Sequence, residues 1–229
     1  MPLTHLASSG PVLVIAPHPD DEVLGVGGTM ARLSDEGVAV HVAVLTTGRP
    51  PRFDARQVGT VRAEAKDAHQ TLGVTQTHWL DLPAAALDTL SHAEANDSLG
   101  ALVRQIDPQT IFLPHLGDIH LDHQLAFLSG MVASRPHQAR FPTAILAYET
   151  LSETNWNAPY LTPAFLPNVF VDISASIDRK LAAFGQFASQ HRAAPHERSV
   201  ETIRALATLR GATVHRPAAE AFVAIRLLA

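Results

Sequence analysis

Three carboxylates and an imidazole lie within five residues near the start of the chain. His18 and Pro19 are followed directly by Asp20, Asp21 and Glu22. Neighbouring carboxylates repel one another, and this stretch contains no lysine or arginine to offset them, so a bound cation would stabilise the group. The alternative is an ordinary turn between a strand and a helix, in which Asp20 or Asp21 serves as the helix N-cap.

The spacing of His18 and Asp21 suits a pair of metal ligands. The two residues are three apart, so in a tight turn that enters a helix both side chains can face one point. Zn²⁺ accepts imidazole nitrogen and carboxylate oxygen together. Asp20 lies between them and would stand beside the metal without binding it. That is the place for a general base that takes a proton from water. Glu22 is expected to orient a ligand or Arg62.

A second group of histidines and aspartates occupies residues 114–124, the stretch PHLGDIHLDHQ. His120 and His123 are three residues apart, with Asp122 between them. A catalytic zinc takes three protein ligands and keeps one position open, so we expect His123 to complete the set and His120 to face the substrate. Asp122 could fix the tautomer of an imidazole by hydrogen bonding. The alternative is a polar loop in which Asp122 caps the next helix.

Apolar, β-branched runs alternate with segments of helical periodicity along the chain. Strands are predicted at 11–17, 38–48, 77–83, 110–115, 144–150, 168–174 and 219–228. Helices are predicted at 27–37, 58–74, 93–108, 121–135, 176–191 and 199–211. This alternation predicts one α/β domain over residues 1–229, with a Rossmann-like, mostly parallel sheet and helices on both faces.

Both groups of polar residues follow predicted strands. The first comes after the strand at 11–17, and the second begins at the end of the strand at 110–115. In open α/β sheets, ligands bind beyond the carboxyl ends of the strands. We therefore expect the two groups, which are far apart in sequence, to lie side by side at that edge of the sheet and to form the active site.

The glycines that follow the first group have two interpretations. A dinucleotide-binding loop would need glycine where Met30 stands, and an acidic residue after the second strand, where the chain has LTTG. The sequence therefore argues against nucleotide binding. We expect Gly25, Gly27 and Gly28 instead to let the helix pack close to the turn that carries the metal.

Composition limits the class of protein. The chain of 229 residues has a formal net charge of −5, which argues against a nucleic-acid partner. It has no cysteine, so any metal must be held by His, Asp or Glu, and 13 histidines are available. The N-terminal residues 1–10 lack the pattern of a secretory signal, and no apolar run is long enough to span a bilayer. We expect a cytoplasmic protein.

The motifs together resemble the LmbE/PIG-L family of zinc-dependent N-acetylglucosamine deacetylases. The resemblance rests on PHPDDE, on HLDH, on GTVRAEA (59–65), on PNVFVDIS (167–174) and on the terminal pattern HERS…RG…AEAF. The family more often has proline where Leu121 stands, which should alter the loop backbone and leave the ligands in place.

The resemblance implies a role for each of several residues. His18, Asp21 and His123 would hold one Zn²⁺ per chain, although other divalent ions remain possible. Asp20 would be the general base, and a protonated His120 would face the tetrahedral intermediate.

Two further residues are predicted to bind substrate. Arg62 matches the family's Arg-x-Glu element; the alternative is an exposed helix arginine paired with Glu64. His196 lies in the basic stretch 189–199 and is expected to reach an active site. Because family members often form oligomers, that site could belong to the same chain or to a neighbouring subunit. The role of Arg198 stays open.

The sequence thus predicts a metal-dependent hydrolase that removes the acetyl group from an N-acetylated amino sugar or its conjugate. One alternative is an amidase with the same zinc chemistry that acts on another acylated amine or on a thiol conjugate. Another is a non-catalytic metal-binding or sugar-binding protein, which would lack Asp20 or His120. We expect a small-molecule substrate, a homo-oligomer and no membrane span.

Overall fold

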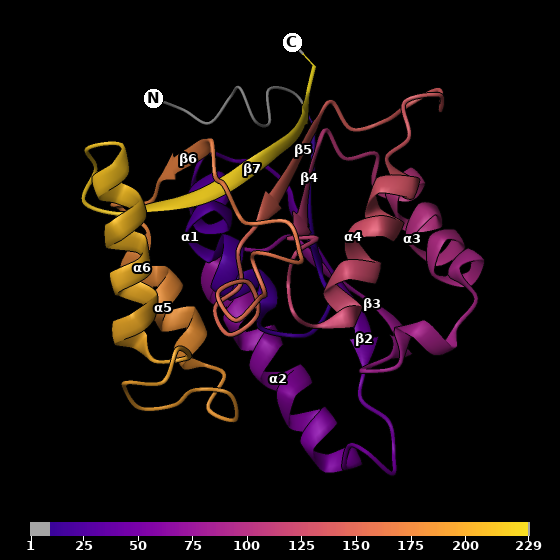
Figure 1. The fold of residues 1–229 in the computed structure, drawn as a ribbon, viewed down its shortest axis with the longest axis horizontal. Coiled ribbons are helices and arrows are strands. Elements are labelled where there is room, and N and C mark those ends of the chain that lie inside the picture. The colour runs from indigo at the N-terminus through magenta and orange to yellow at the C-terminus, as the bar shows by residue number, and fades with distance from the viewer. Residues whose placement is uncertain (1–9, 229) are drawn as a thin grey trace.

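The computed structural model describes residues 10–228, and within them seven strands form one sheet. The strands are β1 (Val12–Ala16), β2 (Val40–Thr47), β3 (Gln76–Pro83), β4 (Thr110–Pro114), β5 (Ala144–Tyr148), β6 (Val169–Asp172) and β7 (Ala219–Leu227). Their order across the sheet is β3-β2-β1-β4-β5-β7-β6 (Figure 1). All neighbours from β3 to β5 are parallel, whereas β7 runs antiparallel to both β5 and β6. The prediction of a mostly parallel sheet is confirmed.

Helices cover both faces of this sheet, as predicted. They are α1 (Asp21–Asp35), α2 (Ala55–Leu72), α3 (His92–Ile106), α4 (Leu121–Ala133), α5 (Ile177–Gly185) and α6 (Val200–Thr213), with a short 3₁₀ turn η1 (Leu87–Thr89). In Figure 1, α1, α2, α5 and α6 lie on one side of the sheet, and α3 and α4 lie on the other.

Strand β1 lies in the middle of these layers and is buried on both faces. Val12 and Val14 belong to the core beneath α1, α2, α5 and α6, whereas Leu13 and Ile15 belong to the core beneath α3 and α4. A strand buried on both sides reads as a continuous apolar run, because neither face can carry polar side chains to water. This is why VLVIA was recognisable as a central strand.

Two helix boundaries differ by six residues from those expected. Helix α1 begins at Asp21 rather than at residue 27, so the motif's last two acids lie in its first turn, where the helix dipole favours negative charge. Helix α5 ends at Gly185 rather than at residue 191. The chain leaves the helix there, and Phe187 enters the core while the following segment reaches α2.

The glycines of α1 allow close packing, although not against the turn that precedes the helix. A side chain at Gly25 would collide with the ring of Tyr148 on β5, and a Cβ at Gly28 would lie 2.7 Å from Ile173. Tyr148 is fully buried, and its hydroxyl donates a hydrogen bond of 2.8 Å to the Ile15 carbonyl. The expected partner was therefore wrong: these glycines bring α1 onto the sheet and onto the chain after β6.

A buried ion pair joins α1, α5 and β7. Lys180 Nζ donates to Glu220 Oε1 at 2.6 Å and to the Leu24 carbonyl at 2.7 Å. Glu220 also accepts hydrogen bonds from the backbone N–H groups of Gly28 and Thr29. Because both charges have several partners, the cost of removing them from water is offset by hydrogen bonds, and the three elements are held in one arrangement.

The helices described here are too short or too polar to cross a membrane. Residues 1–9, where the sequence predicts no secretory signal, lie outside the described part of the chain.

We predict that Gly25→Ala destabilises the protein. The added methyl group collides with a buried aromatic ring that cannot rotate away, and overpacking of this kind costs about 1–3 kcal/mol. Gly59→Ala on α2 is the matched control, because a Cβ there meets nothing within 4 Å. That variant should be unchanged or more stable by about 0.5–1 kcal/mol. Urea unfolding measures both, and a Gly25→Ala protein as stable as wild type would contradict the close packing.

Candidate functional site

The two polar groups singled out in the sequence meet at the carboxyl ends of neighbouring strands. β1 and β4 pair in parallel, so the turn after β1 and the loop after β4 leave the sheet side by side. The first turn leads into α1 and the second leads into α4. The adjacency of these two strands brings residues that are about a hundred positions apart into contact.

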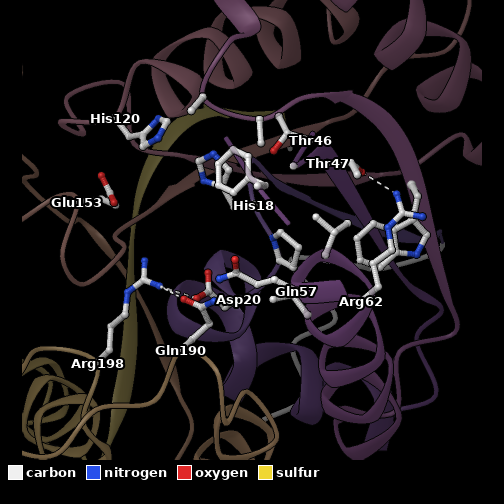
Figure 2. A pocket seen from close by; sticks show the side chains of 18 residues that line it. His18, Asp20, Thr46, Thr47, Gln57, Arg62, His120, Glu153, Gln190 and Arg198 are labelled. Carbon is white, nitrogen blue, oxygen red and sulfur yellow. Dashed lines mark hydrogen bonds and ion pairs between the residues drawn. The ribbon is translucent and has the colours of Figure 1, made fainter. Parts of the chain in front are cut away.

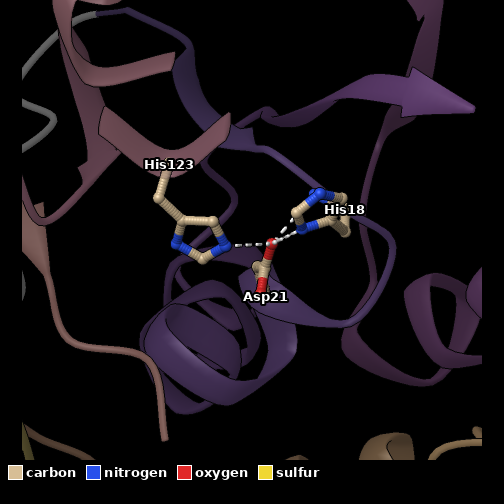
Figure 3. A group of neighbouring side chains, drawn as sticks. All are labelled: His18, Asp21 and His123. Atoms are coloured by element: carbon tan, nitrogen blue, oxygen red, sulfur yellow. Dashed lines mark hydrogen bonds and ion pairs between the residues drawn. The ribbon is translucent and has the colours of Figure 1, made fainter. Parts of the chain in front are cut away.

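Two imidazoles converge on one carboxylate oxygen. His18 Nδ1 lies 3.3 Å from Asp21 Oδ2, and His123 Nε2 lies 3.2 Å from the same oxygen (Figure 3). One ligand atom from each of the three residues lies within 4.8 Å of the other two. Asp21 and His123 are almost fully buried, and His18 retains some exposure toward the surface of the site.

The hydrogen bonds around these residues fit a metal ion. His123 Nδ1 lies 2.8 Å from Asp118 Oδ2, so in the neutral ring this nitrogen carries the proton and Nε2 presents its lone pair. Nε2 is buried and has no hydrogen-bond partner among the described residues, despite its closeness to Asp21. Two imidazole nitrogens and a carboxylate oxygen that face one point form a donor set that Zn²⁺ accepts.

Asp118 is a site residue that sequence reasoning missed. Its side chain is fully buried, with Oδ2 on His123 and Oδ1 accepting a hydrogen bond of 2.6 Å from the Thr154 hydroxyl. The sequence showed an aspartate five residues before His123. It did not show that the loop folds back so that Asp118, rather than Asp122, meets that ring.

Asp122 contacts the other imidazole. Its Oδ2 lies 3.0 Å from His18 Nε2, and its carboxylate also accepts hydrogen bonds from the backbone N–H groups of Ala85 and Leu87. Asp122 therefore orients His18, and His18 turns its Nδ1 toward Asp21. The alternative role as N-cap of α4 belongs instead to His120, whose Nδ1 accepts the backbone N–H of Asp122.

Asp20 occupies a strained backbone position at the start of α1. Its φ is 115°, in the left-handed region that a non-glycine residue rarely adopts. Its side chain makes no helix-capping hydrogen bond; Oδ2 instead accepts a hydrogen bond of 2.7 Å from Arg198 Nη1. The strain is thus tied to a carboxylate that turns away from its own helix toward the site.

A buried chain of hydrogen bonds supports that strained backbone. The backbone N–H of Asp20 donates to Glu22 Oε2 at 3.2 Å, and Glu22 Oε1 lies 2.9 Å from His69 Nε2 on α2. His69 Nδ1 in turn lies 2.7 Å from the Thr77 hydroxyl on β3. Glu22 was expected to orient a ligand or Arg62, and the structure shows that it binds the Asp20 backbone and His69 instead.

Burial and neighbouring charges shift the pKa values of the cluster in opposite directions. Burial raises the pKa of Asp20 to about 7, although Arg198 acts to lower it. Burial disfavours the charged form of His18, yet hydrogen bonds to Asp122 and Asp21 raise its pKa to about 9. Burial also disfavours the charged form of His123, but the nearby Asp21 holds the pKa of this ring well above its usual range. A cation that binds here would displace protons from these imidazoles.

His120 is electrostatically different from its neighbours. Burial and the nearby His18 lower the pKa of His120, which favours the neutral imidazole at neutral pH. Because its Nδ1 accepts the Asp122 N–H, the proton of the neutral ring resides on Nε2. The sequence reasoning assumed a protonated imidazole, and the structure favours a neutral ring that still offers one N–H donor.

A cavity of about 280 Å³ opens above this cluster, and we call it the site cavity. In Figure 2, His120 and Arg62 line opposite sides of it, with His18 and Asp20 between them. Trp79, on which Arg62 stacks, also lines the cavity. Its walls come from the turn after β1, the ends of β2 and β3, α2, and segments that follow β4, β5 and α5.

Arg62 lies in the wall of the site cavity rather than on a solvated helix face. Its Nη2 donates to the Thr47 hydroxyl at 2.6 Å and pairs with Asp81, and its guanidinium stacks 4.5 Å from the centre of the Trp79 ring. The expected alternative partner, Glu64, is engaged elsewhere, since it accepts hydrogen bonds from the backbone and hydroxyl of Ser189.

Two residues of the basic stretch 189–199, Gln190 and Arg198, line the site cavity. The Arg198 guanidinium bonds Asp20, Gln190 and the Ser152 hydroxyl. His196 is exposed, and its Nδ1 accepts the backbone N–H of Arg198. The turn of the chain there points Arg198 into the site cavity, whereas His196 is not among the residues that line it.

Comparison with known proteins agrees with the geometry. The family described as PIG-L: GlcNAc-PI de-N-acetylase matches residues 13–134. Diacetylchitobiose deacetylase of Thermococcus kodakarensis is 32% identical over 190 residues, which is 78% of this chain and 69% of that protein. A probable N-acetyl-alpha-D-glucosaminyl L-malate deacetylase of Bacillus cereus is 29% identical over 194 residues, 80% of this chain and 84% of the other.

A solved structure shows the same fold. The crystal structure of a conserved protein from Thermus thermophilus is 27% identical and superposes with a TM-score of 0.79, over 96% of this chain and 97% of the other. The family match begins at β1 and ends just after α4, so it includes both motifs and the three residues His18, Asp21 and His123. The chain therefore belongs to the PIG-L family of de-N-acetylases, as its motifs predicted.

Proposed function

We propose that this protein is a zinc-dependent deacetylase that removes the acetyl group from an N-acetylated amino sugar or its conjugate. The observation that carries the proposal is the convergence of His18, Asp21 and His123 beside Asp20 and His120 in one cavity. The substrate class is supported by the relatives, which are named as deacetylases of N-acetylglucosaminyl malate and of diacetylchitobiose.

The metal and the protein side chains would divide the chemistry. His18, Asp21 and His123 would hold a divalent ion, and such an ion would lower the pKa of a water molecule and polarise the acetyl carbonyl. The carboxylate of Asp20, oriented by Arg198 on Oδ2, accepts the proton of the attacking water. His120 Nε2–H donates to the oxyanion that develops on the carbonyl oxygen. The proton gained by Asp20 is then available to the leaving amine.

Arg62 and Trp79 would bind the sugar. An aromatic face packs against the apolar face of a sugar ring, and guanidinium N–H groups donate to hydroxyl oxygens. The two side chains stack on each other in the wall of the site cavity, so a sugar bound there would lie beside both of them. A substrate role for His196 and the formation of homo-oligomers remain predictions, as does a cytoplasmic location.

Acetate release tests the function directly. The purified protein is incubated with N-acetylglucosamine, with diacetylchitobiose and with an N-acetylglucosaminyl conjugate, before and after treatment with a chelator. We expect acetate release that the chelator abolishes and added Zn²⁺ restores. If the metal-loaded protein releases no acetate from any of them and hydrolyses another acylated amine instead, the amidase alternative holds.

Metal content should depend on His123 and on Asp118. His123→Ala removes one of three ligands and should abolish stoichiometric binding. Asp118→Asn keeps the ligand but no longer fixes its tautomer, and we expect an affinity about 10–100-fold weaker. Competition with a chromophoric chelator measures both variants. Wild-type affinity in His123→Ala would refute the assigned ligand set.

Turnover should depend on Asp20. Asp20→Asn keeps the size of the side chain and removes its basicity, so we expect the rate to fall roughly 10²–10⁴-fold while the bound metal is retained. Glu22 is the other acid of this motif outside the proposed ligand set, but its oxygens are engaged by the Asp20 backbone and His69. Undiminished turnover in Asp20→Asn would show that another group accepts the proton.

His120→Ala should separate catalysis from metal binding. The variant loses a donor to the developing oxyanion, which is worth about 10²–10³ in kcat, whereas KM should change little. Its metal content should equal that of wild type, because His120 stands outside the proposed ligand set. Loss of metal in this variant would mean that the roles of His120 and His123 are exchanged.

A further inference from the structure

Glu153 is a carboxyl group of the site cavity for which the proposed chemistry has no task. It follows β5 and lines the cavity together with His120 and Arg198, which are labelled on the same side in Figure 2. Its Oε2 is buried and has no hydrogen-bond partner within residues 10–228. A buried oxygen without a donor is costly, so it needs an explanation.

The turn that carries Glu153 is held firmly on both sides. The preceding residue, Ser152, accepts a hydrogen bond of 3.1 Å from Arg198 Nε. The following residue, Thr154, donates to Asp118 Oδ1 at 2.6 Å. Glu153 therefore stands between the side chain that orients Asp20 and the side chain that orients His123. Arg198 and Asp118, which hold this turn in place, also contact Asp20 and His123.

Donor groups of Arg198 and Gln190 in the surrounding wall already have acceptors. Arg198 Nη1 bonds Asp20 and Gln190, and the side-chain amide of Gln190 donates to Ser189. Arg198 still lies close enough to act on Glu153 electrostatically, since the carboxylate helps to raise the pKa of the guanidinium. The charge of Glu153 is thus partly compensated, while its buried oxygen still has no hydrogen bond.

We propose that Glu153 binds a hydrogen-bond donor of the amino-sugar ligand, either the amine that the reaction frees or a sugar hydroxyl. Both groups present N–H or O–H to a carboxylate acceptor, and a charge-assisted bond in a largely buried wall is stronger than a neutral one. The inference rests on the proposed function for the identity of the ligand. It adds a binding residue on the side of the cavity opposite Arg62.

Binding of the two simplest ligands tests this role without turnover. Glucosamine carries the amine and the hydroxyls, and glucose carries the hydroxyls alone. Ligand-observed NMR titration gives Kd values for both with the wild-type protein, Glu153→Gln and Glu153→Ala. We expect glucosamine to bind at least about tenfold more weakly to Glu153→Gln, the effect of losing one hydrogen bond to a charged group.

Glu197→Gln is the matched control. Glu197 also has a buried oxygen without a partner in the described part of the chain, but its other oxygen bonds Asn155 and it stands outside the wall of the site cavity. This variant loses the same unit of charge near Arg198, so it should leave both Kd values unchanged. Metal content and thermal midpoint are measured for every variant, to show that the cluster and the fold are intact.

The ligands distinguish the two sources of the donor. Weaker binding of glucosamine alone assigns the contact to the amine, and equal weakening of both sugars assigns it to a hydroxyl. Unchanged binding in Glu153→Gln and Glu153→Ala overturns the inference, as does a wild-type protein that binds neither sugar. Acetate release by the wild-type protein is a separate measurement, so the proposed function can stand when this inference fails.

Discussion

Two imidazole nitrogens, His18 Nδ1 and His123 Nε2, meet at a single carboxylate oxygen of Asp21, and the rest of the site is arranged around that contact. A cluster of this kind is stable only if each ring is held from its other side. Asp122 bonds one nitrogen of His18, and Asp118 bonds one nitrogen of His123. The other nitrogen of each ring is therefore directed at the same point. The geometry suited to a metal is therefore built into the hydrogen bonds of the protein itself.

That arrangement imposes demands on the backbone. His18 and Asp21 come from one tight turn, and the turn is possible because Asp20 adopts a left-handed conformation. The buried pair of Glu22 and His69 secures this conformation by accepting the Asp20 N–H and linking it to α2 and β3. Strain at a single residue is thus balanced by contacts with two neighbouring elements, and its result is a carboxylate directed at the site cavity.

The walls of the site cavity come from segments that lie far apart in the sequence. Arg62 belongs to α2, Glu153 follows β5, and Arg198 precedes α6. Arg198 connects the turn after β1 with the segment after β5, because it bonds Asp20 and Ser152. Charged groups line the side of the cavity near His18 and Asp20, whereas the opposite side carries Arg62 stacked on the Trp79 ring.

The class of fold and the candidate donor residues could be predicted from the amino-acid sequence alone. Continuous apolar runs such as VLVIA identified the central strands, because a strand covered on both faces has no polar side. The spacing within PHPDDE and HLDH identified the imidazoles and carboxylates, because a local turn brings such residues together wherever it lies. The partners of these residues depend on tertiary contacts: Asp118 meets His123, Arg198 bonds Asp20, and Gly25 of α1 packs on Tyr148. These contacts join elements far apart in the chain. Their partners are set by strand order and by the paths of loops, which leave no periodic pattern in the sequence.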